Sequence, residues 1–199
     1  MANVNLQAEA MTGIFTDPLD KAAHIHEVQV RPLRVNRDPR GILVETLRAD
    51  WSDIFDSERL PFAQTYYSIT EPNVARDETE WHVHQYQEDR FAVLSGDLVI
   101  GLHDPRPDSP TTGVVNLFLL GESLGDYGQV AVLIPKRVHH GFVVGPDRPA
   151  LLTNFPTRIY DPGDEGRIPF DQVDARMSDG TVFSWDLVRK ALDAPTTNG

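Results

Sequence analysis

Residues 81–102 read WHVHQYQEDRFAVLSGDLVIGL, and this stretch decides the fold of the chain. In an extended strand successive side chains alternate, so His82 and His84 share one face while the apolar residues beside them face the other. Two short apolar runs follow at 90–94 and 97–102, with a length typical of strands. The stretch therefore predicts short neighbouring β-strands with two histidines turned toward one space.

Similar apolar or alternating runs recur along the chain. The segments 104–110, 125–128 and 145–147 separate them and have typical turn compositions. Helical periodicity is found near the C-terminus, where Phe183, Leu187, Val188, Ala191 and Leu192 share one face, and a turn is expected at 51–55. The predicted architecture is an all-β antiparallel barrel or jelly roll with a short C-terminal helix. The runs are 27–33, 41–47, 62–69, 90–94, 97–102, 114–120, 129–134, 140–144 and 150–154.

Length and composition limit the functions to consider. A chain of 199 residues suits one domain, which we place at 23–175, with an N-terminal tail at 1–22 and the C-terminal helix and tail at 176–199. The net charge of −12 and the absence of any Lys/Arg run argue against binding to nucleic acid or to an anionic membrane. The chain has no cysteine and hence no disulfide or thiolate nucleophile.

The sequence lacks two features that would direct a protein to or across a membrane. No apolar run approaches the roughly 20 residues that span a bilayer, and the first residues do not resemble a secretion signal. We therefore expect a cytoplasmic protein.

A histidine pocket is the candidate site. Four of the seven histidines lie in two stretches, 81–84 and 138–142. If the second stretch forms a strand beside the first, His140 joins His82 and His84 at the mouth of the barrel. Three interpretations of such a cluster remain open.

In the first interpretation the cluster binds a metal. Three neutral imidazoles and a carboxylate suit zinc, iron, nickel or manganese, and the ligands would be His82, His84, Asp89 and His140. Their spacing resembles the two cupin motifs, although Asp89 stands where those usually have glutamate and Arg137 where they have glycine. In the second interpretation the histidines are structural and hydrogen-bond one another and buried carbonyls.

In the third interpretation a neutral histidine removes a proton next to a ketone, and nearby donors hold the enolate. Epimerisation also needs a separate acid on the opposite face, commonly a tyrosine. Each tyrosine alone is a weak candidate, because most half-buried tyrosines in a barrel only pack. The five are Tyr66, Tyr67, Tyr86, Tyr127 and Tyr160.

From Asp38 to about Pro169 the order of motifs resembles the dTDP-4-dehydrorhamnose 3,5-epimerase family of cupin barrels. The resemblance implies a cupin-type jelly roll and a metal-free isomerase that acts on a nucleotide-linked 4-keto-6-deoxysugar in polysaccharide biosynthesis. It is carried by Arg40-Gly41 with Glu45, Phe62-Ala63-Gln64, Ser95-Gly96-Asp97, Asp104-Pro105-Arg106, Ser109-Pro110-Thr111, Ile134-Pro135, His140-Gly141-Phe142 and Tyr160-Asp161-Pro162. The patterns Trp81–His84 and Asn154–Thr157 occur in a subset of relatives described as epimerase-like.

The resemblance also assigns roles to residues. It implies that His82 is the general base and His140 the second pocket histidine. The residues implied to bind substrate are Arg40, Glu45, Gln64, Arg90 and Asn154. In the family the strand from Arg40 to Glu45 crosses a dimer interface, so the resemblance implies a homodimer.

Three departures from the family pattern narrow the expected activity. Thr79 and Asp89 replace two cationic residues, with Arg90 as a substitute for the second. The strand that should present the acid tyrosine contains Thr153 and Asn154, which lack a phenol. Double epimerisation is therefore not expected. The favoured function is a cofactor-free epimerase or isomerase, and the alternatives are an enzyme that uses one divalent transition metal and a non-catalytic sugar-binding cupin.

Overall fold

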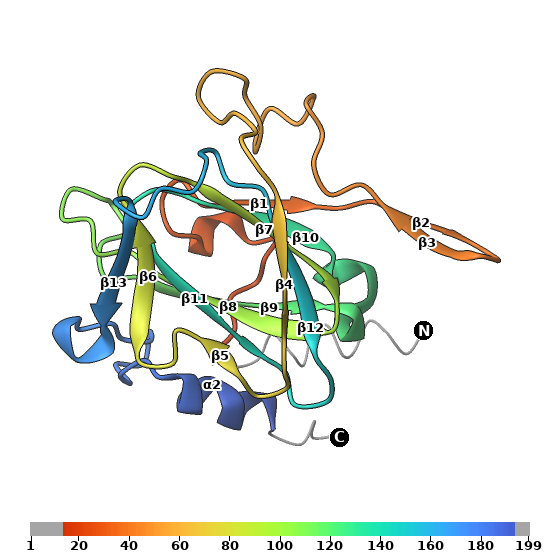
Figure 1. Cartoon of the computed structure of the whole chain (residues 1–199). Coiled ribbons are helices and arrows are strands. Elements are labelled where there is room, and N and C mark those ends of the chain that lie inside the picture. The colour runs from red at the N-terminus through yellow and green to blue at the C-terminus, as the bar shows by residue number, and fades with distance from the viewer. Residues whose placement is uncertain (1–13, 194–199) are drawn as a thin grey trace.

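The computed structural model of the protein describes residues 14–193, which form a jelly roll of two antiparallel sheets packed face to face (Figure 1). The first sheet has the strand order β1-β10-β7-β12-β4. The second has the order β13-β6-β11-β8-β9, and the short β5 pairs with β11. The two sheets do not close into a barrel, so the jelly-roll form of the predicted fold is confirmed.

The strand boundaries follow the apolar runs of the sequence. Strands of the first sheet are β1 (Gln29–Pro32), β4 (Tyr66–Thr70), β7 (Asp89–Ser95), β10 (Val130–Ile134) and β12 (Ala150–Asn154). Those of the second sheet are β5 (Ala75–Arg76), β6 (Glu80–His84), β8 (Asp97–His103), β9 (Val115–Gly121), β11 (His139–Val144) and β13 (Glu165–Pro169). A separate hairpin, β2 (Val35–Asp38) and β3 (Gly41–Val44), projects from the body (Figure 1).

The helices are short. They are the 3₁₀ helices η1 (Lys21–Ala23), η2 (Glu122–Gly128) and η3 (Phe170–Gln172), and the α-helix α2 (Trp185–Leu192). Ser184 caps α2 by accepting a hydrogen bond from the backbone N–H of Leu187, a typical helix start. The predicted C-terminal helix is thus confirmed. Within the described residues no helix has the length and apolar character needed to cross a membrane.

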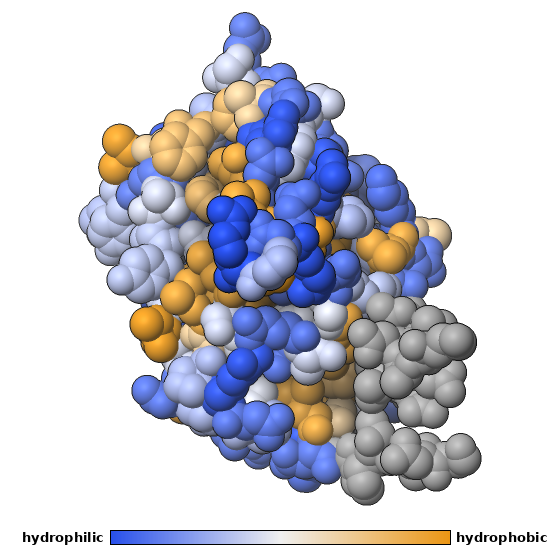
Figure 2. Space-filling model, turned by 90° about the vertical axis from the view of Figure 1, so that its right-hand side faces the viewer, coloured by the Kyte–Doolittle hydropathy of each residue, from blue (hydrophilic) through white to orange (hydrophobic). Residues whose placement is uncertain are grey.

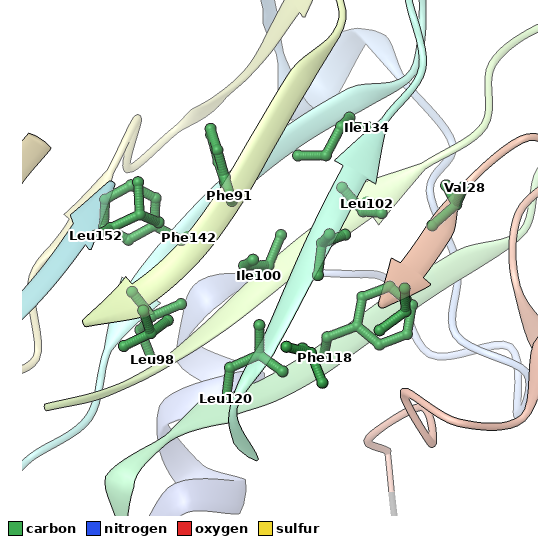
Figure 3. Packing of buried hydrophobic residues seen from close by; sticks show 14 of the residues in the cluster. Val28, Phe91, Leu98, Ile100, Leu102, Phe118, Leu120, Ile134, Phe142 and Leu152 are labelled. Atoms are coloured by element: carbon green, nitrogen blue, oxygen red, sulfur yellow. The ribbon is translucent and has the colours of Figure 1, made fainter. Parts of the chain in front are cut away.

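The main core lies between the two sheets (Figure 3). Alternation along β7, β8 and β10 sends every second side chain inward, where Phe91, Ile100 and Val132 are almost completely buried. Leu98, Leu102, Phe118 and Phe142 fill the space between them. This packing fixes the relative position of the two sheets and therefore of the side chains that they contribute to the pocket.

A second apolar layer covers the outer face of the histidine-bearing sheet. Trp81, Phe183 and Trp185 pack together there, with His103 and His139 stacked against Trp81. The Trp185 indole lies over two paired glycines, Gly101 of β8 and Gly141 of β11. A β-carbon at either glycine would lie 2.9 to 3.1 Å from this ring, so the close approach requires glycine.

The N-terminal segment differs from the expected tail. Residues 1–13 lie outside the described part of the chain, as do residues 194–199. Ile14 and Phe15, in contrast, pack against the second apolar layer, and the backbone N–H of Thr16 donates to the carbonyl of Leu117. The described part of 14–22 is therefore attached to the jelly roll.

Candidate active site

Three histidines meet at one end of the second sheet. His82 of β6 and His140 of β11 are direct partners in the antiparallel register. His84 lies two residues further along β6, and its Nε2 is 3.1 Å from the Nε2 of His82. The alternation predicted from the sequence therefore places His82 and His84 on one face, where His140 joins them.

The histidines border a pocket of about 260 Å³ whose walls come from both sheets. Phe91, Phe142 and Leu152 make part of the wall apolar, whereas the other side chains are polar or charged. The polar and charged lining residues are Tyr66, Ser68, Arg76, Asp77, His82, Asp89, His140, Glu165 and Arg167. A mainly preformed pocket with a few polar groups on its walls is typical of a small-molecule site.

Asp89 is the buried anion of this site. It accepts hydrogen bonds from the amide nitrogens of Asn154 at 2.8 Å and Gln87 at 2.9 Å. Its Oδ2 lies 3.3 Å from Nε2 of His140 and 3.5 Å from Nε2 of His84. Burial raises the pKa of Asp89, but the two histidines and Asn154 outweigh it and lower the pKa to about 2. The carboxylate is therefore ionised at neutral pH.

His82 is neutral in the same surroundings. Burial, and then the charges that His140 and His84 would carry, lower the pKa of His82 to about 3, and Asp89 opposes this only in part. A neutral imidazole has one nitrogen with a free lone pair. His82 can therefore accept a proton from a ligand in the pocket.

Tyr66 supplies a phenol to this pocket. It begins β4, where it is the direct register partner of Asn154 on β12, and its hydroxyl accepts a hydrogen bond of 2.9 Å from the Asn154 amide. Burial of the hydroxyl and the negative charges of Asp89 and Glu165 raise the pKa of Tyr66 to about 12, against the opposing effect of Asn154. The phenol is thus protonated at neutral pH.

This phenol is a site residue that sequence analysis did not assign. The strand expected to carry the acid has Asn154, and the tyrosine stands opposite it on the neighbouring strand. Of the other tyrosines, Tyr67 is 67% exposed and Tyr127 donates to Asp17. Alternation along β4 was the available signal, because Tyr66 and Ser68 share the pocket face while Tyr67 and Ile69 point outward.

Two arginines that the sequence analysis also passed over border the pocket. Arg76 of β5 donates from Nε to the hydroxyl of Thr70 at 3.1 Å, and its guanidinium is otherwise at the surface. Arg167 of β13 forms ion pairs with Asp77 and, at 2.7 Å, with Glu165. These two guanidinium groups border the pocket together with the carboxylates of Asp77, Asp89 and Glu165.

Arg90, which the sequence analysis expected among the substrate-binding residues, does not line the pocket. Only 1% of this residue is exposed. Its guanidinium donates to the backbone carbonyls of Ile54, Leu60, Pro61 and Phe155, on the opposite side of the sheet from the pocket-facing Asp89 and Phe91. Arg90 instead holds the segment 54–61 against the first sheet.

Asn154, also expected to bind substrate, lies behind the pocket-lining residues. It is fully buried, and its amide nitrogen is shared between Asp89 and Tyr66. Its oxygen accepts from the backbone N–H of Arg90 at 3.0 Å. Asn154 therefore orients two pocket residues and does not itself line the pocket.

The remaining predicted binding residues lie outside the pocket of this chain. Arg40 is at the turn of the projecting hairpin and pairs with Asp38, while Glu45 follows β3 and pairs with Arg48. Gln64 lies in the loop before β4 and does not line the pocket. The structure thus brings together the histidines and Asp89 but not these three residues.

Comparison with known proteins identifies the family. The sequence profile of the dTDP-4-dehydrorhamnose 3,5-epimerase family matches residues 22–188. The chain belongs to this family. The family resemblance seen in the sequence, and with it the prediction of an isomerase, is therefore confirmed.

Two relatives and one solved structure are similar to this chain over most of its length. The probable low-salt glycan biosynthesis epimerase Agl13 of Haloferax volcanii is 42% identical over 151 residues, which are 74% of this chain and 90% of that protein. The spore coat polysaccharide biosynthesis protein SpsL of Bacillus subtilis is 32% identical over 81% of this chain and 97% of its own. The crystal structure of a dTDP sugar isomerase from Desulfovibrio desulfuricans superimposes with a TM-score of 0.67 at 27% identity, covering 81% of this chain and 92% of that one.

Proposed function

We propose that the protein is an isomerase that transfers a proton at the carbon next to the ketone of a nucleotide-linked 4-keto-6-deoxysugar. The observation that carries this proposal is the pairing of a neutral His82 on one sheet with a protonated Tyr66 on the other, across a single pocket. The names of the relatives support it, since they include a glycan biosynthesis epimerase and a dTDP sugar isomerase.

The reaction follows from these positions. The imidazole of His82 takes the proton from the carbon, the electrons of the broken C–H bond form a carbon–carbon double bond, and the ketone oxygen takes the negative charge. His140 borders the pocket beside His82 and is our candidate for polarising that oxygen. Tyr66 then donates a proton to the carbon from the opposite side, which inverts the centre, and its phenolate regains a proton from solvent. These steps need no cofactor.

A nucleotide-linked substrate carries a negatively charged diphosphate, and the protein itself has a net charge of −12. Binding therefore requires local positive charge at the pocket. Arg76 and Arg167 are our candidates for this charge at the pocket, because both are partly exposed and therefore accessible to a ligand. We propose that they replace the cationic contacts expected near Thr79 and Arg90. Such a substrate places the protein in glycan biosynthesis, in the cytoplasm.

We further propose a homodimer in which the hairpin β2–β3 reaches a second copy. The hairpin extends away from the body that it belongs to (Figure 1) and presents Ile42 and Leu43, which are 52% and 63% exposed. Viewed from the side toward which the hairpin extends, the surface carries hydrophobic groups among hydrophilic ones (Figure 2), as expected for an interface with polar contacts. Arg40 and Glu45 would then reach the pocket of the partner.

Solvent deuterium exchange tests the reaction. The protein is incubated in D₂O with dTDP-4-keto-6-deoxyglucose, and incorporation at the carbons next to the ketone is followed by NMR. We expect incorporation with the wild type and a loss of at least a hundredfold in His82→Ala. His103→Gln is the control, because His103 lies on the other face of the second sheet and should leave the rate unchanged. Unimpaired exchange by His82→Ala would refute the assignment of the base.

A further inference from the structure

His84 and Asp89 are buried beside the proposed base, but neither gives or takes a proton in the proposed reaction. The side chains of His84 and Asp89 are 11% and 2% exposed. No lysine or arginine in the described part of the chain forms an ion pair with Asp89, whose partners are Gln87, Asn154 and two histidines. A buried carboxylate faced by histidine rings calls for an explanation, because isolated buried charge is costly.

The spacing of the three histidines fits ligands around one ion, and the carboxylate of Asp89 lies beside two of them. Donor atoms of His82, His84 and His140 all lie within 4.8 Å of one another. The neighbouring separations are 3.1 Å from His82 to His84, 3.5 Å from His84 to Asp89 and 3.3 Å from His140 to Asp89. Adjacent ligand atoms on an ion with bonds of about 2.0–2.2 Å lie roughly 3.0–3.5 Å apart in octahedral or tetrahedral geometry.

Hydrogen bonds on the outer side of the rings orient the lone pairs inward. Nδ1 of His84 lies 3.2 Å from the carbonyl oxygen of Asp164, and Nδ1 of His140 lies 3.1 Å from that of Val138. A ring nitrogen beside a carbonyl must donate, so each Nδ1 carries a proton and Nε2 is the nitrogen on the Asp89 side, where it is an N–H donor in the protonated ring and offers a lone pair in the neutral one. Metal-binding histidines show this arrangement, with the second nitrogen donating to a backbone carbonyl.

The Gln87 amide nitrogen donates to Oδ1 of Asp89 at 2.9 Å and lies 3.1 Å from Nε2 of His84. In the neutral rings, the lone pairs of His84 and His140 and Oδ2 of Asp89 still converge on one space, which favours a cation there. Protons can meet this need, and so can a metal ion. We propose that His82, His84, His140 and Asp89 bind one divalent transition metal ion, with the remaining coordination positions open to the pocket. Three imidazoles and one carboxylate suit zinc, iron, manganese or nickel.

This site has a consequence for the reaction. A neutral imidazole has a single lone pair, so a His82 that binds metal cannot accept a proton. The metal-loaded protein therefore lacks the base, and metal binding and proton transfer compete for His82. The metal site stands on the geometry alone, whereas the competition rests on the proposed isomerase reaction.

Metal content and cobalt absorption test the site directly. Untagged protein is stripped with a chelator, desalted and titrated with Co²⁺ or Zn²⁺, and bound metal is measured by elemental analysis. We expect about one ion per chain, visible absorption bands with Co²⁺, and a higher melting temperature with either ion. In His84→Gln, and in the isosteric Asp89→Asn, the affinity should fall about a hundredfold or more.

His139→Gln is the matched control. His139 is the neighbour of His140 on β11, but it faces the opposite side of the sheet, where it packs against Trp81 and His103. This variant should bind metal like the wild type. The site is refuted if the wild type takes up far less than one ion per chain, or if both ligand variants bind metal as tightly as the wild type.

Deuterium exchange in the metal-free and Zn²⁺-loaded protein separates the two proposals. We expect exchange in the metal-free form and a decrease of at least tenfold on loading. Exchange that is unchanged or faster after loading would overturn the competition for His82. If neither form exchanges, the isomerase proposal fails, and the metal site is still decided by the metal content and the ligand variants.

Discussion

At the scale of single residues, the site depends on buried polar side chains that hold others in place. Asn154 links the Tyr66 hydroxyl to the Asp89 carboxylate, and Asp89 links Asn154 to His84 and His140. None of these links is visible in the sequence, because each joins residues from different strands. The strands bring them together through register, so one chain of contacts connects both walls of the pocket.

Replacing Tyr66 by phenylalanine should separate the two halves of the reaction. The variant keeps the ring and the base but loses the acid, so deuterium should still enter the substrate while inversion falls about a hundredfold or more. NMR of the recovered sugar reports both quantities in one experiment. Tyr67→Phe is the control, since that side chain is 67% exposed. Inversion at the wild-type rate in Tyr66→Phe would show that another group is the acid.

Replacing Arg90 by methionine should affect stability and not substrate binding. The change leaves carbonyl oxygens of Ile54, Leu60 and Phe155 without their donor, and we expect a loss of about 2–4 kcal/mol in the free energy of unfolding. Urea denaturation measures this loss. An increase in KM with unchanged stability would contradict our placement of Arg90 and restore it to the binding site.

At the scale of secondary-structure elements, the second sheet is shaped by what covers its outer face. The pairing of Gly101 with Gly141 leaves a flat area on which the Trp185 ring rests, and Trp185 is the first residue of α2. Gly141 also lines the pocket on the other face of the same sheet. The C-terminal helix therefore packs directly behind the histidine-bearing strands.

A β-carbon at Gly101 should disturb this packing. It would lie 2.9 Å from Cη2 of Trp185, and we expect Gly101→Ala to lower the free energy of unfolding by about 1–3 kcal/mol. A double-mutant cycle with Trp185→Phe, followed by urea denaturation, isolates the contact. The smaller ring should make the alanine less costly. Strictly additive losses would show that the strain arises elsewhere.

The paired histidines behind the sheet should make the protein sensitive to acid. Burial lowers the pKa of His103 and, with the charge of His103, lowers that of His139 to about 4. The unfolded chain binds these protons at about pH 6.5, so protonation favours unfolding, and stability should fall as the pH drops from about 6.5 toward 4. Urea midpoints across this range measure the slope. His103→Gln should reduce it, and an equal slope in that variant would contradict the assignment.

The sequence predicted the elements better than it predicted their contacts. All nine apolar runs contain a strand, because alternation of apolar residues is a local property that survives folding. The short β5 and the β13 strand, which contains Gly166 and ends at Pro169, carry too few apolar residues to show a period. Arg90 was misplaced because its carbonyl partners lie about thirty or more residues away in the chain.

At the scale of the whole molecule, contacts within one chain do not explain why the hairpin β2–β3 projects from the body. Arg40 and Glu45 lie on it or next to it and away from the pocket, and its apolar side chains remain exposed. A second copy that covers them would account for both observations. The sequence thus predicted the histidines of the candidate site. Periodicity along one chain cannot show which residues a second chain adds to that site.

Leu43→Arg should prevent such an association. Leu43 is 63% exposed in the single chain, so the change should leave the fold intact while it introduces charge into the proposed interface. Light scattering after gel filtration should show a dimer for the wild type and a monomer for the variant. Tyr86→Arg, at a similarly exposed position outside the hairpin, is the control. A monomeric wild type would refute the homodimer.

Two of the three tryptophans, Trp81 and Trp185, lie on the far side of the strands that carry His82 and His140. Trp81 is the immediate neighbour of His82, and Trp185 lies against the backbone of Gly141, next to His140. Indole emission depends on the local environment, so this placement gives the protein a built-in fluorescence reporter of its own pocket. Occupation of the site can then be followed in solution without a label and without turnover.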